Sequence, residues 1–179
     1  MRIPRRLVLA AGPLTLAACQ SPTARPTNPA ASQAQVDFVT DAYQVIRFDR
    51  EQGAIAETEA RDPRVRAIAQ RLVQQANDYA ETLFPLAARN GIEPPEVLRY
   101  DLRVRLGHMR LQRGLDFDRT YVADQIASHE EALRSAEELE RSGGLDPQFA
   151  ALLRHGKELV QANLTALREL QRDLGPPAS

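Results

Sequence analysis

Three polar side chains interrupt the apolar stripes of this chain at positions from which they could share one site. Asp49, His129 and Asn163 each lie near the middle of a long segment in which apolar residues recur at every third or fourth position. The corresponding position of a fourth such segment is Ala76. This spacing is typical of helices that bury one face. Because the midpoints of four aligned helices fall in one cross-section, the sequence predicts that Asp49, His129 and Asn163 meet in the core.

A carboxylate, an imidazole and an amide in one layer could form a metal centre. Helical bundles that hold two iron or manganese ions commonly use four carboxylates and two histidines, with Glu-x-x-His on each of two helices. Here the residue three positions before His129 is Ile126, and Glu-x-x-His occurs nowhere in the chain. We therefore expect no metal and no cofactor. If iron or manganese is bound, the candidate ligands are Asp49, His129 and Asn163. Otherwise these residues form a hydrogen-bonded polar cluster or face water at the edge of the helix seam.

The single cysteine of the chain suggests a different chemistry, covalent lipid attachment. A basic start is followed by an apolar stretch over residues 7–18, which is shorter than the roughly 20 residues of a membrane span. The sequence Leu16-Ala17-Ala18-Cys19 then resembles the bacterial lipobox. That resemblance implies a signal peptide over residues 1–18, which is removed, and acyl chains such as palmitate on Cys19. The alternative is that Cys19 is an ordinary small residue beside a conventional cleavage site.

The surroundings of Cys19 indicate where the protein resides. Gln20 stands where an aspartate would resemble the inner-membrane retention signal of enteric bacteria, so we expect an outer-membrane anchor facing the periplasm. Arg5-Arg6 partly fits a twin-arginine export signal, so the general secretory and twin-arginine routes both stay open. Residues 19–36 are rich in Pro, Ser, Thr and Ala and are expected to form a disordered tether. Residues 37–174 form the predicted folded domain, and residues 175–179 are expected to be a disordered tail.

Two Asp-Pro pairs indicate where helices begin. Asp62-Pro63 and Asp146-Pro147 each place a capping side chain before a proline at the first helical position. Together with the apolar stripes, they predict helices over about 37–60, 63–90, 117–141 and 147–173. The connection over residues 91–116 carries apolar residues on one face, and we expect it to hold a short helix packed across one end of the bundle.

Length and composition restrict the class of protein. The chain has 179 residues, of which 43% are hydrophobic and 26% charged, and its net charge is -1. About 140 residues remain after the predicted leader and tether, which suits one domain. The abundance of Ala, Leu, Arg, Glu and Gln favours helix, so the predicted fold class is all-α. Since the net charge gives no bulk attraction to phosphates, no nucleic-acid partner is expected.

These features together resemble a family of bacterial ferritin-like envelope proteins, domain of unknown function 4142 (DUF4142). The resemblance covers about residues 37–172, and its most specific segment is Phe117-Asp118-Arg119-x-Tyr121-Val122. Further matches are Asp37-Phe38-Val39, Asp62-Pro63-x-Val65, Ser128-His129 and Gly144-Leu145-Asp146-Pro147. It implies a ferritin-like up-down four-helix bundle with a short extra helix between the second and third long helices, and a secreted or lipid-anchored location.

The same resemblance implies a degenerate metal layer in this chain. Family members typically have glutamate in place of Asp49, an Asp-His pair in place of Gln75-Ala76 and histidine in place of Asn163. Only His129 matches in kind. The residues that the family would offer to a metal are therefore mostly replaced.

Two function hypotheses follow. The first is a non-catalytic envelope lipoprotein module, anchored in the membrane, that binds an envelope protein, peptidoglycan or lipid. The second is a metal-binding or redox protein that uses the bundle-centre residues. We expect no enzyme, because no Gly-x-Ser-x-Gly and no nucleophile-base pair is found. A weaker hypothesis is a basic face for anionic lipid, but acidic residues are interspersed and favour a solvated surface; its arginines are Arg99, Arg103, Arg105, Arg110 and Arg113.

Overall fold

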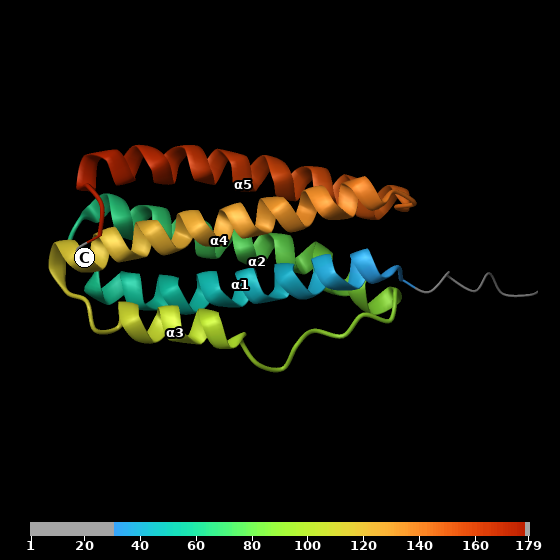
Figure 1. Ribbon diagram of the computed structural model, residues 1–179, viewed down its shortest axis with the longest axis horizontal. Helices are drawn as coiled ribbons and strands as arrows, with labels where there is room; N and C mark the ends of the chain where they lie inside the picture. The colour runs from blue at the N-terminus through green and yellow to red at the C-terminus, as the bar shows by residue number, and fades with distance from the viewer. Residues whose placement is uncertain (1–30, 178–179) are drawn as a thin grey trace, which may run out of the picture.

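A computed structural model describes residues 31–177, which form five α-helices and no named strand (Figure 1). The helices are α1 (Gln33–Glu59), α2 (Pro63–Arg89), α3 (Tyr100–Met109), α4 (Gly114–Ser142) and α5 (Pro147–Leu174). The predicted signal peptide, Cys19 and most of the predicted tether lie outside the described residues. None of the helices within residues 31–177 is both long and apolar enough to cross a membrane.

The Asp-Pro pairs begin helices as the sequence predicts. The Asp62 carboxylate accepts a hydrogen bond from the Arg64 amide at 2.8 Å, and Pro63 is the first residue of α2. The Asp146 carboxylate accepts from two amides at the start of α5, Gln148 N at 2.8 Å and Phe149 N at 3.1 Å. Each carboxylate thus satisfies backbone donors that have no partner inside the helix.

Helix α1 begins earlier than predicted, so the final residues of the expected tether, 33–36, are helical instead. Ser32 and Gln35 form a capping box: Ser32 Oγ accepts from Gln35 N at 3.2 Å, and Gln35 Oε1 accepts from Ser32 N at 2.8 Å. This reciprocal pair stabilises the first turn, and the last proline of the tether, Pro29, lies before it. Helix α4 also begins early, at Gly114 rather than 117.

The four long helices form a bundle in which neighbours run antiparallel. Helix α1 packs against α2 and α4, and α5 packs against α4 and α2. The chain direction in Figure 1 shows that α2 and α4 run the same way and lie diagonally opposite. The chain must therefore return along the length of the bundle between them.

Helix α3 lies on this return path, lengthwise beside α1 and α4 (Figure 1). The predicted packing of the short helix across one end of the bundle is wrong. A link between two antiparallel helices could cross at one end, but a link between two parallel helices has to span the bundle. Leu102, Leu106 and Met109 of α3 face the core and are buried.

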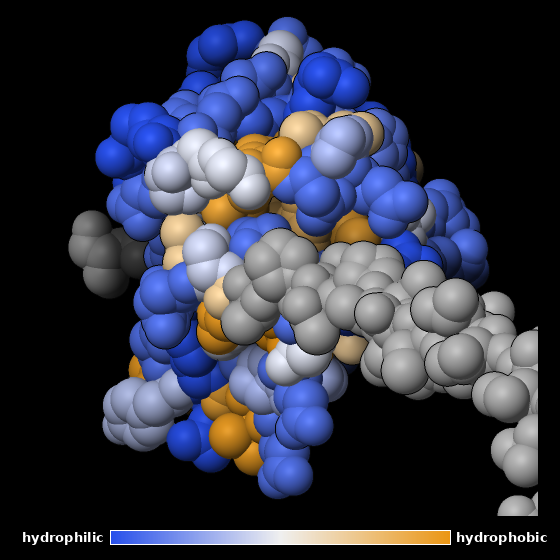
Figure 2. All heavy atoms as spheres, turned by 90° about the vertical axis from the view of Figure 1, so that its right-hand side faces the viewer, coloured by the Kyte–Doolittle hydropathy of each residue, from blue (hydrophilic) through white to orange (hydrophobic). Residues whose placement is uncertain are grey.

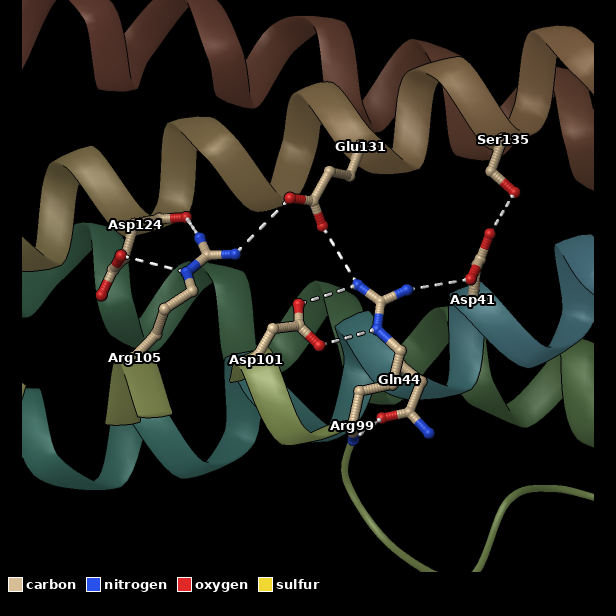
Figure 3. A network of polar contacts seen from close by, with 8 residues as sticks. All are labelled: Asp41, Gln44, Arg99, Asp101, Arg105, Asp124, Glu131 and Ser135. Atoms are coloured by element: carbon tan, nitrogen blue, oxygen red, sulfur yellow. Dashed lines mark hydrogen bonds and ion pairs between the residues drawn. The ribbon is translucent and has the colours of Figure 1, made fainter. Parts of the chain in front are cut away.

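Side chains of α1 and α4 hold this returning segment in place (Figure 3). Gln44 donates to the Val97 carbonyl oxygen at 3.0 Å and accepts from the Arg99 amide at 2.8 Å. The Arg99 guanidinium pairs with Asp41 at 3.1 Å and with Glu131 at 3.2 Å. The segment is thus fixed by amide and ion-pair contacts at the point where α3 begins.

The Phe-Asp-Arg-x-Tyr segment joins two chain turns at one end of the bundle. The buried Asp118 carboxylate accepts from the amides of Arg61 at 3.0 Å and Asp62 at 2.8 Å, in the turn between α1 and α2. Arg119 Nε donates to the carbonyl oxygen of Leu174 at the end of α5 at 2.7 Å. This segment therefore connects α4 to the ends of three other helices.

The apolar core consists of two clusters. One contains Phe48, Leu72, Phe117 and Tyr121 and includes the inner face of α3. The other contains Phe38, Leu83, Leu139 and Phe149. At one end of the molecule, where α1 begins, the hydrophobic surface is broken into separate strips among hydrophilic residues (Figure 2). The buried polar residues of the bundle centre lie beside both clusters.

Candidate functional site

A partly open cavity of about 90 Å³ lies between α1, α2, α4 and α5. Asp49, His129 and Asn163 all border it, so the structure brings the three sequence-predicted residues to one place. Ala76, the fourth mid-helix residue, forms part of its wall. The rest of the wall is mainly apolar and includes Phe38, Ala42, Val45, Ile46, Leu72, Tyr79, Ala132, Leu133, Ala136, Leu153, Leu159 and Val160.

His129 and Asn163 contact each other directly. Asn163 Nδ2 lies 3.4 Å from His129 Nε2 and 2.9 Å from Gln75 Oε1 of α2. His129 Nδ1 lies 2.9 Å from the carbonyl oxygen of Gln125. A carbonyl oxygen only accepts and an amide nitrogen only donates, so these partners assign the proton to Nδ1 and leave the Nε2 lone pair facing Asn163.

Asp49 reaches the other two residues through Gln125 rather than directly. Gln125 Nε2 donates to Asp49 Oδ1 at 3.0 Å and to Gln52 Oε1 at 2.7 Å. Within residues 31–177, no hydrogen bond joins Asp49 to His129 or Asn163. The backbone carbonyl of Gln125 accepts from His129, and its side-chain amide donates to Asp49. This one residue therefore links Asp49 to the His129–Asn163 pair.

The hydrogen-bonded network continues from the bundle centre to α3. Gln52 Nε2 donates to Asp124 Oδ2 at 3.3 Å. The Arg105 guanidinium donates to Asp124 through Nε at 3.1 Å and to the Asp124 carbonyl oxygen through Nη2 at 2.5 Å (Figure 3). Arg105 also lies over the Phe48 ring, at 4.9 Å from its centroid. With Gln75 and Asn163 at the other end, the network connects all five helices.

Burial favours the neutral forms of Asp49 and His129. Asp49 is 5% exposed, and burial raises the pKa of its carboxyl to about 7 despite the hydrogen bond from Gln125. His129 is 3% exposed, and burial lowers the pKa of its imidazole to about 4, while the contact with the Gln125 carbonyl acts in the opposite direction. Removing water disfavours a charge of either sign, so the two pKa values move in opposite directions.

Three buried polar atoms on the inner face of α4 have no hydrogen-bond partner within residues 31–177. They are the Tyr121 hydroxyl, Gln125 Oε1 and Ser128 Oγ. Burial and the nearby Asp49 carboxyl raise the pKa of Tyr121, which keeps its hydroxyl protonated. On α4, the polar layer beside Asp49 therefore contains side-chain groups that can form further hydrogen bonds.

The donor set does not fit a di-iron or di-manganese centre. Within the described part of the chain, no three His, Cys, Asp or Glu side chains come together as a group able to hold a metal ion. Besides the Tyr79 hydroxyl and the Lys157 amine, the cavity offers one carboxyl, one imidazole and two amides, and the carboxyl is already engaged by Gln125. Hard divalent ions are usually held by several charged oxygen ligands.

The residues that sequence reasoning missed are amides. Gln75, Gln52 and Gln125 bridge the predicted positions, although a glutamine on a helix usually faces water. For Gln125 a signal existed, since it lies one turn before His129 on the same stripe. Cys19, the predicted lipidation site, lies outside the described residues.

Comparisons with known proteins agree with this architecture. No curated protein matches the chain. A solved structure described as a crystal structure of a DUF305 fragment from Deinococcus radiodurans is similar with a TM-score of 0.71 and 15% identity, covering 80% of this chain and 99% of that one. That likeness concerns the fold, which is of ferritin-like type, and the predicted all-α bundle is confirmed. A family model matches residues 20–170, and the chain belongs to the family described as domain of unknown function (DUF4142).

Proposed function

We propose that this DUF4142 member is a non-catalytic lipoprotein module of the bacterial envelope whose bundle centre binds a small apolar group. The observation that carries the proposal is the cavity of about 90 Å³, whose wall is mainly apolar and whose polar residues are Asp49, His129, Asn163, Gln75, Tyr79 and Lys157. The module is anchored through Cys19 in the outer membrane and faces the periplasm. It acts by binding rather than by chemistry.

The polar layer supports binding more than catalysis. A general base must lie within hydrogen-bond reach of the group whose proton it takes. Within residues 31–177, neither Asp49 nor His129 is hydrogen-bonded to a hydroxyl that it could activate. The His129 ring is held between the Gln125 carbonyl and Asn163, which fixes its orientation.

The size and lining of the cavity define the chemical class of the ligand. Sites for drug-sized ligands measure roughly 300–1,000 Å³, so this cavity admits only a single ring or a short alkyl group. One hydrogen-bonding atom on that group would face His129 and Asn163, while the rest contacts the alanine, valine and leucine side chains. Phenol has this chemistry, and toluene has the same ring with a methyl group in place of the hydroxyl.

Binding is tested by thermal and urea unfolding with phenol and with toluene. At ten times its Kd, a ligand of the native state raises the free energy of unfolding by about 1.4 kcal/mol. We expect phenol to stabilise the chain more than toluene does. Ala132→Phe fills the cavity and should abolish the effect, while Ala162→Phe, at an exposed position of α5, should retain it. Equal responses of the two variants would contradict the proposed site.

The envelope anchor is tested separately by metabolic labelling. Radiolabelled palmitate should enter the wild-type chain and not Cys19→Ser, and the labelled protein should fractionate with the outer membrane. Equal labelling of both chains would refute lipidation at Cys19. This result does not depend on the ligand, so the anchor and the cavity can fail independently.

A metal-binding function is the second candidate, because Asp49, His129 and Asn163 border one cavity. It predicts near-stoichiometric iron or manganese in protein purified without added metal, and loss of that metal in His129→Leu. The proposed binding module predicts a sub-stoichiometric content that His129→Leu does not change. Elemental analysis of both proteins decides between the two.

A further inference from the structure

The large hydrophobic side chains that the described chain exposes are concentrated in one short segment, around α3. Val97 is 66% exposed, Tyr100 75%, Val104 51% and Leu111 79%. We name these four residues the outer stripe. Leu115, which follows Leu111 in the sequence at the start of α4, is 36% exposed. No other large hydrophobic residue within residues 31–177 reaches this exposure, so the outer stripe is a local feature of the returning segment.

Helix α3 is apolar on two opposite sides. Leu102, Leu106 and Met109 face the core and are almost fully buried. At 3.6 residues per turn, Tyr100 and Val104 fall on the side opposite to them. Val97 precedes the helix and Leu111 follows it, and together they extend this outer side in both directions. The inner side explains why α3 packs on the bundle, but it does not account for the outer stripe.

Arginines flank the outer stripe, and four of the five are paired with carboxylates. Five arginines and one aspartate lie between Val97 and Leu115, although the whole chain has a net charge of -1. Arg99 and Arg105 are engaged with carboxylates of α1 and α4. Arg103 lies over the Tyr100 ring, at 5.8 Å from its centroid, and is exposed.

Two further arginines follow α3. Arg110 and Arg113 are paired only at 3.9 Å with Glu51 and 3.5 Å with Glu59, and their side chains are 56% and 67% exposed. Arg113 also donates through Nη1 to the carbonyl oxygens of Arg110 at 2.7 Å and Gln112 at 2.6 Å, so the Arg110 guanidinium is the freer of the two to turn towards an anionic partner. Such solvent-exposed pairs contribute little to stability, so releasing them costs little.

We propose that the outer stripe is a bilayer-contact face that rests on anionic phospholipid headgroups. An exposed tyrosine beside valine and leucine, flanked by arginines, matches the composition of helices that lie in the membrane interface. A second protein is disfavoured by area, because a stable interface buries roughly 800 Å² on each partner and the outer stripe comprises four side chains.

The chain outside the described residues supports this orientation. Twelve residues separate Cys19 from Ser32 and span at most about 40 Å, which is close to the length of α1 at about 1.5 Å per residue. If Cys19 is acylated, as proposed above, the outer stripe stays within reach of the same bilayer. A contact that is weak alone is then sufficient, because the anchor raises its effective concentration.

Vesicle co-sedimentation tests the face without the anchor. The full chain carrying Cys19→Ser is mixed with vesicles of phosphatidylglycerol and phosphatidylcholine, and with vesicles of phosphatidylcholine alone. We expect binding to the anionic vesicles, and a partition coefficient at least five-fold lower for the additional pair Val104→Glu and Leu111→Glu. The leader is present in every chain, so its contribution cancels in the comparison.

The matched control adds the same two negative charges elsewhere. Ala151→Glu and Ala162→Glu lie at exposed positions of α5 and should lower the partition coefficient less than two-fold. An equal loss in both double variants would overturn the proposal, because only net charge would matter. Absence of binding to anionic vesicles, or concentration-dependent dimers that Val104→Glu abolishes, would also overturn it. The palmitate experiment reports on Cys19 alone, so failure of the anchor is distinguishable.

A fluorescent probe gives a second measurement at the face itself. The chain contains no tryptophan, so Tyr100→Trp introduces a single indole at an exposed position. Its emission should shift to shorter wavelength, and brominated lipids should quench it, when anionic vesicles are added. Ala162→Trp serves as the control and should change in neither respect. Equal quenching at the two positions would contradict contact through the outer stripe.

Discussion

Asp49 and His129 border one cavity, and burial keeps both neutral near pH 6. The pKa of the carboxyl is about 7 and that of the imidazole about 4, so each group stays neutral at pH values where the same group in water is at least partly charged. Gln125 serves both through different atoms and lets them share a layer without forming an ion pair. At the scale of the residue, the site is a cluster of hydrogen-bonded amides around two titratable groups that burial keeps uncharged.

These pKa values predict opposite pH dependences of stability. The pKa of Asp49 is raised on folding, so its stabilisation is present below pH 4 and is lost as the pH rises to about 7. The pKa of His129 is lowered, so its stabilisation is present above pH 6.5 and is lost as the pH falls to about 4. Each group changes the free energy of unfolding by at most about 1.4 kcal/mol per pH unit, and where the two pH ranges overlap their effects oppose each other.

Two variants separate the contributions in urea unfolding between pH 4 and pH 8. Asp49→Asn keeps an acceptor for Gln125 and should gain stability over wild type with rising pH, by up to about 4 kcal/mol. His129→Leu should gain over wild type with falling pH, by up to about 3 kcal/mol. Comparison with wild type cancels the other titrating groups. If both differences changed with pH in the same direction, the assignment would be wrong.

At the scale of the helix, ends and connections depend on a few side chains that satisfy backbone groups. Asp118 of α4 accepts from two amides in the turn between α1 and α2, and Arg119 donates to the last carbonyl of α5. Gly53 of α1 has no room for a Cβ because the Val73 side chain of α2 occupies that position. Helix pairing therefore rests on close approach in one place and on polar contacts in another.

Asp118→Asn tests the turn contact. An amide has one acceptor oxygen, so one of the two backbone donors at Arg61 and Asp62 would lose its partner in a buried place. We expect a loss of about 1–3 kcal/mol in the free energy of unfolding. Asp116→Asn, in the exposed first turn of α4, is the control and should cost less than about 0.5 kcal/mol. Similar losses for both would show that charge, rather than the turn contact, matters.

At the scale of the molecule, one polar network connects all five helices beside two apolar clusters. It runs from Gln75 through Asn163, His129, Gln125, Gln52 and Asp124 to Arg105 of α3. The cavity lies between the four long helices and none of the outer-stripe residues lines it, so ligand binding and bilayer contact can occur together. At the amino end of the described residues, the capping box at Ser32 marks the start of α1.

This boundary predicts how far the chain can be shortened. A chain that begins at Ala31 retains the Ser32–Gln35 capping box and should match the full chain in unfolding free energy within about 0.5 kcal/mol. A chain that begins at Asp37, the boundary expected from the sequence, loses the box and should be less stable by about 1–2 kcal/mol. Urea unfolding of the three chains measures both differences. A large loss on removing residues 1–30 would show that they contribute to the fold.

The sequence by itself determined the helices, the family and the mid-helix place of Asp49, His129 and Asn163. These follow from local rules, since Asp-Pro pairs cap helices and apolar spacing fixes the buried face. Only the tertiary structure decided that Gln125 bridges the layer and that α3 runs lengthwise with an outer apolar face. Amide pairing depends on which helices become neighbours, and the path of α3 depends on α2 and α4 running parallel. Neither can be predicted from the periodicity of a single helix.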